Sequence, residues 1–248
     1  MKKKILIFTG AGISQESGIR TFRDSKDGMW EEFKVEEVAS IGGWRKDKLK
    51  VIDFYNRRRK ELESVSPNKA HQIVADLEND FDVTIVTQNV DNLHERSGST
   101  NVIHLHGELT KARGSLYDSK VSPLDTVIDI GYNDIKIGDI CSVTGAQLRP
   151  HITWFGEVLD STNLELARKS AEEADFCIVV GTSMQVSPAN TIPFLTKETS
   201  LIYYVDPGTA DFYIPEYRQS TFSHINEIAS IGMEKVYNEL IKIKYGGV

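Results

Sequence analysis

The chain has 248 residues, 40% of them hydrophobic, and its 29 basic and 36 acidic side chains give a formal net charge of −7. That length is enough for one sizeable α/β core, or for a large domain with a small one inserted. No apolar stretch is long enough to span a membrane, and the acidic balance argues against nucleic acid as the main partner. The apolar run after the basic start, residues 5–8, is too short for a secretory signal, so we expect a cytoplasmic protein.

Short runs of branched residues alternate along the chain with stretches of helical periodicity. The predicted strands are, in chain order, residues 5–9, 83–87, 102–105, 176–181 and 201–206. The predicted helices are residues 47–63, 68–78, 163–174 and 225–244. This alternation predicts an α/β fold with a parallel sheet and helices on both of its faces. Residues 111–147 are polar and break the pattern, so we expect them to form a small insertion outside the main sheet.

Polar residues and glycines follow every predicted strand. They are Gly10-Ala11-Gly12, Gln88-Asn89-Val90-Asp91, His106-Gly107, Gly181-Thr182-Ser183 and Asp206. Ligands of parallel α/β sheets bind outside the carboxyl ends of the strands, so these residues are the candidate site. The first glycines allow a tight turn and a close approach to a pyrophosphate. Gln15 stands where a dinucleotide fingerprint needs a third glycine, so a tight turn without ligand remains the alternative reading of that motif alone.

Five longer motifs resemble those of the sirtuin family, in the family's order and at its usual spacing. They are Gly10-Ala11-Gly12-Ile13-Ser14 with residues 16–23, residues 88–94 (Gln-Asn-Val-Asp-Asn-Leu-His), residues 104–109 (His-Leu-His-Gly-Glu-Leu), residues 149–157 (Arg-Pro-His-Ile-Thr-Trp-Phe-Gly-Glu), and Gly181-Thr182-Ser183 with Val186 and Pro188. The resemblance covers nearly the whole chain. It implies a single catalytic domain over residues 1–248, with a Rossmann-type core and small-domain insertions at about 24–65 and 111–147.

The resemblance also implies that NAD and an acyl-lysine of a protein or peptide meet in a cleft. The residues expected to bind NAD are Gly10, Ala11, Gly12, Ile13, Phe22, Arg23, Gln88, Asn89, Val90, Asp91, Gly181, Thr182, Ser183 and Asp206. Among them, the glycine turn and Arg23 are expected at the diphosphate, and Gln88 and Asn89 at the ribose next to the nicotinamide. Phe155 and Gly156 are expected on the peptide side.

His106 resembles the general base of the family, and its imidazole titrates near neutrality, as a base at pH 7 requires. His104, two residues earlier on the same strand face, is expected to be structural and hydrogen-bonded. The implied activity is NAD-dependent protein-lysine deacylation that releases nicotinamide and 2′-O-acyl-ADP-ribose. The alternatives are an NAD glycohydrolase or ADP-ribosyltransferase on the same fold, which would also need Asn89 and His106, and a non-enzymatic NAD sensor.

The insertion departs from the family, most of whose members hold a zinc ion there with two pairs of cysteines. Cys141 suits the third ligand, but Thr144 stands at the fourth position and Gly114 near the first. One thiolate cannot assemble a tetrahedral zinc site, so we expect no zinc.

Tyr55 and Arg58 form a Tyr-x-x-Arg pair, which in this family resembles enzymes that prefer acidic acyl groups such as succinyl or malonyl. The apolar residues of the predicted helix 47–63 share one face with Arg58, whereas Arg57 and Arg59 are expected to point away. A guanidinium on an apolar face needs a partner. We expect the acyl carboxylate to be that partner and predict dual activity on acidic and acetyl groups. The alternatives are an ion pair with a structural carboxylate, or an arginine whose head reaches water.

Overall fold

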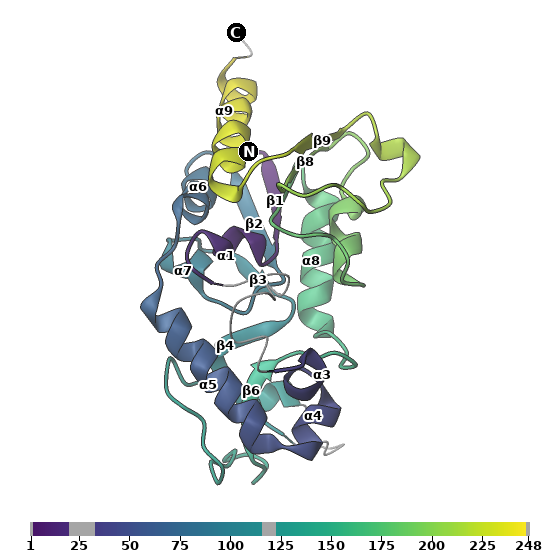
Figure 1. Cartoon of the computed structure of the whole chain (residues 1–248). Helices are drawn as coiled ribbons and strands as arrows, with labels where there is room; N and C mark the ends of the chain where they lie inside the picture. The colour runs from purple at the N-terminus through teal and green to yellow at the C-terminus, as the bar shows by residue number, and fades with distance from the viewer. Residues whose placement is uncertain (1, 20–32, 116–122, 247–248) are drawn as a thin grey trace.

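The structure is a computed structural model of the chain, and it describes residues 2–19, 33–115 and 123–246. Six parallel strands form the main sheet in the order β3-β2-β1-β7-β8-β9 (Figure 1). The strands are β1 Lys4–Thr9, β2 Asp82–Thr87, β3 Val102–His104, β7 Phe176–Val180, β8 Leu201–Val205 and β9 Phe222–Ile225. The first five confirm the predicted strands.

The sequence pattern missed strand β9 and placed the start of the last helix too early. Helix α9 spans Ala229–Tyr245, and Ile225 belongs to β9 instead. This strand has four residues, is partly exposed along its whole length and pairs only with β8 at the edge of the sheet. An edge strand without buried residues lacks the continuous apolar signal of the buried strands.

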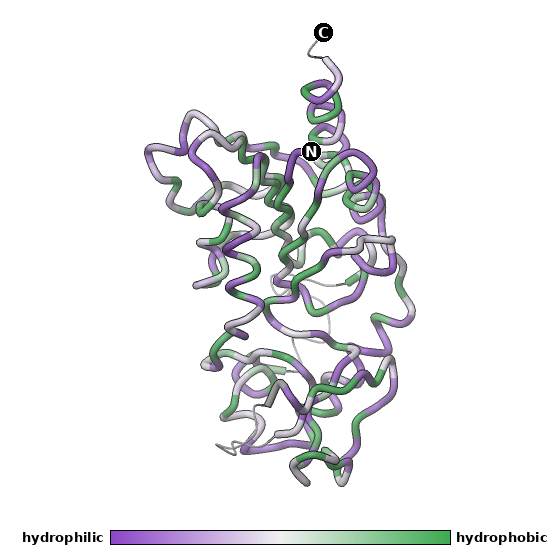
Figure 2. The backbone as a smooth tube through the Cα atoms, turned by 180° about the vertical axis from the view of Figure 1, so that it is seen from behind, coloured by the Kyte–Doolittle hydropathy of each residue, from purple (hydrophilic) through white to green (hydrophobic). Residues whose placement is uncertain are grey.

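Helices cover both faces of the main sheet, as predicted (Figure 1). Helix α6 (Lys69–Leu77) and α9 pack on the face that carries Ile5 and Ile7. Helix α8 (Ser161–Glu173) and the 3-10 helix η2 (Ala189–Leu195) pack on the face that carries Leu6 and Phe8. Successive side chains of a strand point to opposite faces, so a continuous apolar strand fills both cores. Figure 2 shows these strands as a hydrophobic layer at the centre of the upper part.

A second, three-stranded sheet lies below the first and has its own core. Its strands are β4 (Gly107–Gly114), β5 (Ile128–Asp129) and β6 (Leu148–Ile152), in the antiparallel order β5-β4-β6. Helices α3 (Val35–Val38), α4 (Ile41–Lys46) and α5 (Lys48–Ser64) pack against it. The described part of residues 111–147 therefore lies outside the main sheet, as predicted. The second sheet extends beyond that range, because β4 begins at Gly107 and β6 spans Leu148–Ile152. Short helices α1 (Gly12–Gln15), α7 (Leu93–Arg96), η1 (Pro123–Thr126) and η3 (Glu216–Arg218) complete the described elements.

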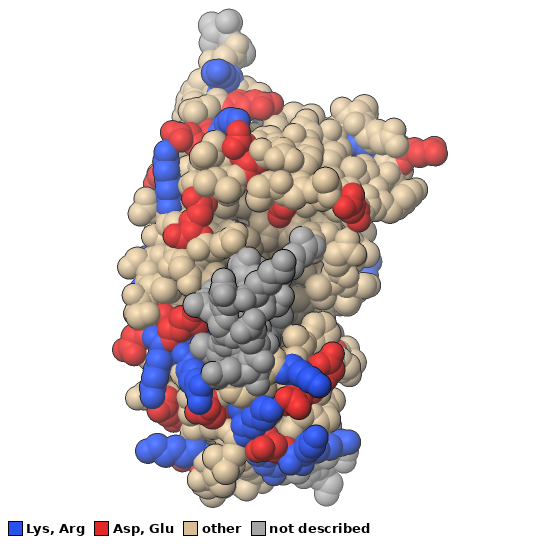
Figure 3. All heavy atoms as spheres, in the orientation of Figure 1, with Lys and Arg blue, Asp and Glu red and all other residues tan. Residues whose placement is uncertain are grey.

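Helix α5 corrects one sequence prediction. Asp47 caps its first turn by accepting a hydrogen bond from the Lys50 amide at 2.9 Å. The predicted apolar face is buried, but Arg59 is buried with it and is 0% exposed, so the prediction that it points away was wrong. Its Nε donates to the Leu109 carbonyl of β4 at 2.7 Å, which places the charge inside the small core. Figure 3 shows Lys and Arg interspersed with Asp and Glu on the outer side of this part of the molecule.

Candidate functional site

The loops after β1 and β7 meet at the carboxyl edge of the main sheet. Strand β1 pairs with β2 on one side and β7 on the other, so this is where the order of the strands reverses. A Cβ on Gly10 would lie 2.6 Å from the Thr182 Cβ, and one on Gly12 would lie 2.6 Å from the Gly181 Cα. Gly181 has a φ of +62° and is equally crowded by Gly12. Only glycines allow these two loops to touch, and such a junction is where doubly wound sheets bind dinucleotides.

The loop after β2 is tied to this junction by buried hydrogen bonds. Asn89 Nδ2 donates to the Gly10 carbonyl at 3.0 Å and to Ser14 Oγ at 3.2 Å. Ser14 Oγ in turn donates to Asp91 Oδ2 at 2.9 Å. Burial raises the pKa of Asp91, although the hydrogen bonds from the Leu93 amide and from Ser14 oppose that effect. Sequence reasoning gave Ser14 no role. Its place at the end of the Gly10–Ser14 motif was the signal that could have pointed to it.

A buried chain of polar groups supports the same loop from behind. The His94 ring lies 3.1 Å from Thr9 Oγ1, which donates to Thr87 Oγ1 at 2.8 Å. Thr87 Oγ1 also accepts the Asn89 amide at 3.0 Å, so β1, β2 and α7 together fix the start of the loop.

His106 follows β3 and faces the Gln88 backbone. Its Nδ1 lies 3.0 Å from the Gln88 carbonyl, which can only accept a hydrogen bond. Nδ1 therefore carries the proton, and the lone pair of the neutral ring is on Nε2. Burial lowers the pKa of His106 from its ordinary value, so the ring is neutral at pH 7. The Gln88 side chain also accepts from Thr182 Oγ1 at 2.9 Å, which joins the loops after β2 and β7.

The remaining predicted cofactor residues lie at the same edge, with two exceptions. Ala11 and Ile13 flank Gly12, the Val90 carbonyl accepts the Leu109 amide at 2.8 Å, and Ser183 follows Thr182. Asp206 follows β8 and is half-buried, and its Oδ1 accepts the Gly208 amide at 2.8 Å. Phe22 and Arg23 lie outside the described residues.

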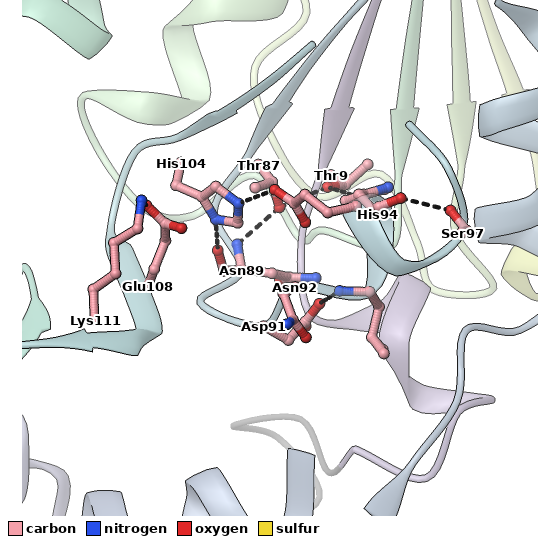
Figure 4. Close-up of polar contacts among 12 residues, drawn as sticks. Thr9, Thr87, Asn89, Asp91, Asn92, His94, Ser97, His104, Glu108 and Lys111 are labelled. Carbon is pink, nitrogen blue, oxygen red and sulfur yellow. Dashed lines mark hydrogen bonds and ion pairs between the residues drawn. The ribbon is translucent and has the colours of Figure 1, made fainter. Parts of the chain in front are cut away.

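His104 is buried and hydrogen-bonded on both ring nitrogens, as the sequence predicted for a structural histidine. Nδ1 lies 3.0 Å from the carbonyl oxygen of Asn89, and Figure 4 shows these two residues side by side. Nε2 lies 2.8 Å from Glu95 Oε1. Both partners are acceptors, so only the doubly protonated ring satisfies them. Burial alone would lower the pKa of His104, but the hydrogen bond and charge of Glu95 outweigh it and raise the pKa. Sequence reasoning missed Glu95, which holds a charged histidine under Asn89.

The predicted peptide-side residues follow β6 at the surface. Phe155 is 59% exposed, its amide donates to the Ala39 carbonyl at 3.0 Å, and it forms a parallel bridge with Ser40. Gly156 is also exposed and has a φ of +87°. The turn is held from below by Glu157, which accepts both Arg149 terminal nitrogens at 2.7 and 3.0 Å and the Trp154 amide at 2.9 Å. Sequence reasoning gave Glu157 no role.

Tyr55 and Arg58 both lie on the inner side of α5 but have different partners. The Tyr55 hydroxyl accepts a hydrogen bond from Trp154 Nε1 at 3.0 Å. Arg58 Nη1 forms an ion pair with Glu61 at 2.8 Å, so a carboxylate partner, one of the alternatives, is present within the protein. Arg58 and Glu61 also line one small cavity together with Val90 and Asp91, next to the loop after β2.

The positions compared with zinc ligands lie together in the second sheet region. A Cβ on Gly114 would be 2.9 Å from Thr144 Oγ1 and 3.4 Å from Cys141 Sγ. In the described ranges, no group of three or more His, Cys, Asp or Glu side chains could hold a metal ion. The hydrogen bond from Thr144 lowers the pKa of Cys141. The absence of zinc stays a prediction.

The helices of the described ranges include none that is both long and apolar enough to cross a membrane.

Comparisons with known proteins identify the family of the chain. The Sir2 family profile matches residues 10–188. An NAD-dependent protein deacylase of Helicobacter pylori strain 26695 is 43% identical over 97% of this chain and 99% of its own length. An NAD-dependent protein deacylase of Bacteroides thetaiotaomicron is 40% identical over 96% of this chain and 98% of its own length. The crystal structure of a Sir2 homolog–NAD complex superposes with a TM-score of 0.82 at 36% identity, covering 98% of this chain and 91% of that one. The chain that carries the glycine junction, the loop after β2 and the histidine after β3 therefore belongs to the Sir2 (sirtuin) family.

Proposed function

We propose that the protein is an NAD-dependent protein-lysine deacylase that releases nicotinamide and 2′-O-acyl-ADP-ribose. The observation that carries this proposal is the state of His106. Its Nδ1 proton is held by the Gln88 carbonyl at 3.0 Å, and burial lowers its pKa. A neutral ring with its lone pair on Nε2 is what a general base requires, and Nε2 is the atom that would accept the proton.

The strand-end residues fit NAD. The contact of Gly10 and Gly12 with Gly181 leaves no room for side chains and lets backbone approach a diphosphate. Asn89 and Asp91 supply amide and carboxyl groups in the loop after β2, and Asp206 follows β8, three strands away in the sheet. When bound, NAD would supply a ribose carbon that accepts the acyl oxygen once nicotinamide has left. The protein would orient the two reactants and exclude water, which can contribute several kcal/mol to a barrier.

We place the acyl-lysine between the Phe155-Gly156 turn and helix α5. The bridge between Ser40 and Phe155 brings two extended backbones side by side near an exposed aromatic ring. Exposed extended backbone of this kind is a common docking site for peptides. The relatives named above are protein deacylases, which supports the same class of substrate for this chain.

We further propose that acidic acyl groups, succinyl and malonyl, are accepted beside acetyl. The Arg58 side chain is 14% exposed and lines a cavity together with Asp91 of the loop after β2. A charge-assisted hydrogen bond contributes about 1.5–3 kcal/mol. Replacing Arg58 by Met should therefore lower kcat/KM for succinyl-lysine by about 10- to 150-fold, with a much smaller effect on acetyl-lysine.

The test is a panel of one peptide carrying different acyl-lysines, incubated with and without NAD and read by mass spectrometry. We expect 2′-O-acyl-ADP-ribose from the wild-type protein and a loss of at least about 100-fold in the folded His106→Ala variant. Free ADP-ribose formed without peptide would instead identify an NAD glycohydrolase. Equal losses of succinyl and acetyl turnover in Arg58→Met would assign Arg58 a structural role.

A further inference from the structure

The charge of Arg58 is already neutralised by a second residue of the same helix, Glu61. Glu61 lies three residues after Arg58, and the two heads form an ion pair of 2.8 Å. The side chains are 14% and 24% exposed, so the pair is better shielded than Arg57 with Asp53 one turn earlier, at 49% and 51%. Shielded charges are screened less by salt and solvent than exposed ones.

The place of this pair connects it with substrate. Arg58 and Glu61 line the same cavity as Val90 and Asp91, which belong to the loop after β2, and Leu109 of β4. The cavity measures about 20 Å³, which is room for roughly one water molecule. An acyl chain does not fit in so small a space, so one with a terminal carboxylate can reach Arg58 only if the cavity widens. Its carboxylate then meets a guanidinium that already holds another carboxylate.

We propose that Glu61 is a specificity-determining residue of the acyl site, because it competes with the substrate carboxylate for Arg58. This inference rests on the proposed preference for acidic acyl groups. An acidic acyl group must displace Glu61 or share Arg58 with it, and two carboxylates at one cation repel each other. An acetyl group carries no charge and has no such competitor. Glu61 thus lowers activity on acidic acyl groups and brings it closer to the activity on acetyl groups.

The opposite role is physically reasonable and gives the opposite result. If Glu61 served to hold Arg58 in the correct orientation, removing its charge would weaken the binding of acidic acyl groups. Glu61→Gln separates the two roles because the amide keeps the size of the side chain and one acceptor oxygen but removes the charge. Glu63→Gln is the matched control, since it removes the same charge from an exposed position on the same helix.

The experiment measures kcat/KM of the full-length chain for one peptide carrying either succinyl-lysine or acetyl-lysine at saturating NAD. The ratio of the two values is compared for wild type, Glu61→Gln, Glu63→Gln, Arg58→Met and the double variant of residues 58 and 61. We expect Glu61→Gln to raise the succinyl-to-acetyl ratio by about two- to fivefold, mainly through KM, as the loss of a competing ion pair implies. Glu63→Gln should not change it, and Glu61→Gln should have no effect when Arg58 is absent.

The outcomes separate this inference from the proposal on which it rests. If Arg58→Met lowers the ratio but Glu61→Gln leaves it unchanged or lowers it, the competition is overturned and the acidic preference stands. If Arg58→Met does not lower the ratio, the acidic preference fails and the competition fails with it. A rise in the ratio for Glu61→Gln that persists without Arg58 would show that Glu61 repels the substrate directly, which also overturns competition for Arg58.

Discussion

Replacing Arg59 by Met should destabilise the protein although Arg59 contacts no reacting group. The guanidinium is 0% exposed, and it donates to the Leu109 carbonyl at 2.7 Å, to Asn56 Oδ1 at 2.7 Å and to the Asn133 carbonyl at 3.3 Å. The pairing of β4 with β6 is interrupted between Glu108 and Ala112, so the Leu109 carbonyl depends on Arg59. Methionine fills a similar volume but leaves that carbonyl buried without this donor.

The expected loss is about 2–4 kcal/mol in the free energy of unfolding. Each hydrogen bond to a charged group contributes about 1.5–3 kcal/mol, and a buried acceptor left without a donor adds a penalty. Burial of the charge offsets part of this, and it lowers the pKa of Arg59 to about 10. For a chain of this size, such a loss corresponds to a fall of about 4–16 °C in Tm.

The assay is urea unfolding followed by circular dichroism, with Arg57→Met as the control on the same helix. Arg57 has a half-exposed side chain that pairs with Asp53, so its replacement should change stability by less than about 0.5 kcal/mol. Because Arg59 fixes α5 against β4, deacylation of succinyl and acetyl substrates should fall together in Arg59→Met. A variant as stable as Arg57→Met would refute the idea that these buried hydrogen bonds anchor α5.

Three further predictions concern titration and metal. Because burial lowers the pKa of His106, the acid limb of the kcat/KM profile should fall below pH 6.5, the ordinary histidine value. A limb above pH 6.5 would contradict a neutral, buried base. The pKa of His104 is raised in the folded state, so the stability that it contributes is complete below about pH 6.5 and is lost as pH rises through the folded pKa. The stability difference between wild type and Glu95→Gln should accordingly shrink as urea unfolding is repeated at higher pH, whereas a constant difference would argue against a charged pair. A strong chelator should alter neither activity nor Tm, and stoichiometric zinc found by elemental analysis would show that the expectation of no zinc is wrong.

The sequence predicted the position of the site better than its internal connections. Buried parallel strands have an apolar signal of their own, and whatever follows them must lie at one edge of the sheet. That reasoning brought Gly10, Asn89, His106 and Thr182 together before any contact was known. It could not find β9, because a short, partly exposed edge strand has no such signal.

Arg59 shows a different limit. The prediction that it points away assigned too narrow an apolar face to the helix, because Arg59 follows Tyr55 by four residues and precedes Leu62 by three, a spacing that places it on the same face. Its partners Leu109 and Asn133 are 50 and 74 residues further along the chain. Local periodicity carries no information about acceptors at that distance. A buried arginine of this kind is recognised only when the fold brings backbone carbonyls to it.

His104 at the end of β3 and His106 just after it show why residue type alone could not predict the charge of each ring. His104 and His106 are two residues apart, and each places Nδ1 3.0 Å from a backbone carbonyl of the same loop. They differ in what Nε2 meets. His104 has the Glu95 carboxylate, which raises its pKa, whereas burial lowers the pKa of His106. The general base that we propose at His106 must be neutral, whereas a support for the Asn89 carbonyl gains from charge. The position of Glu95 on α7 therefore distinguishes the two histidines.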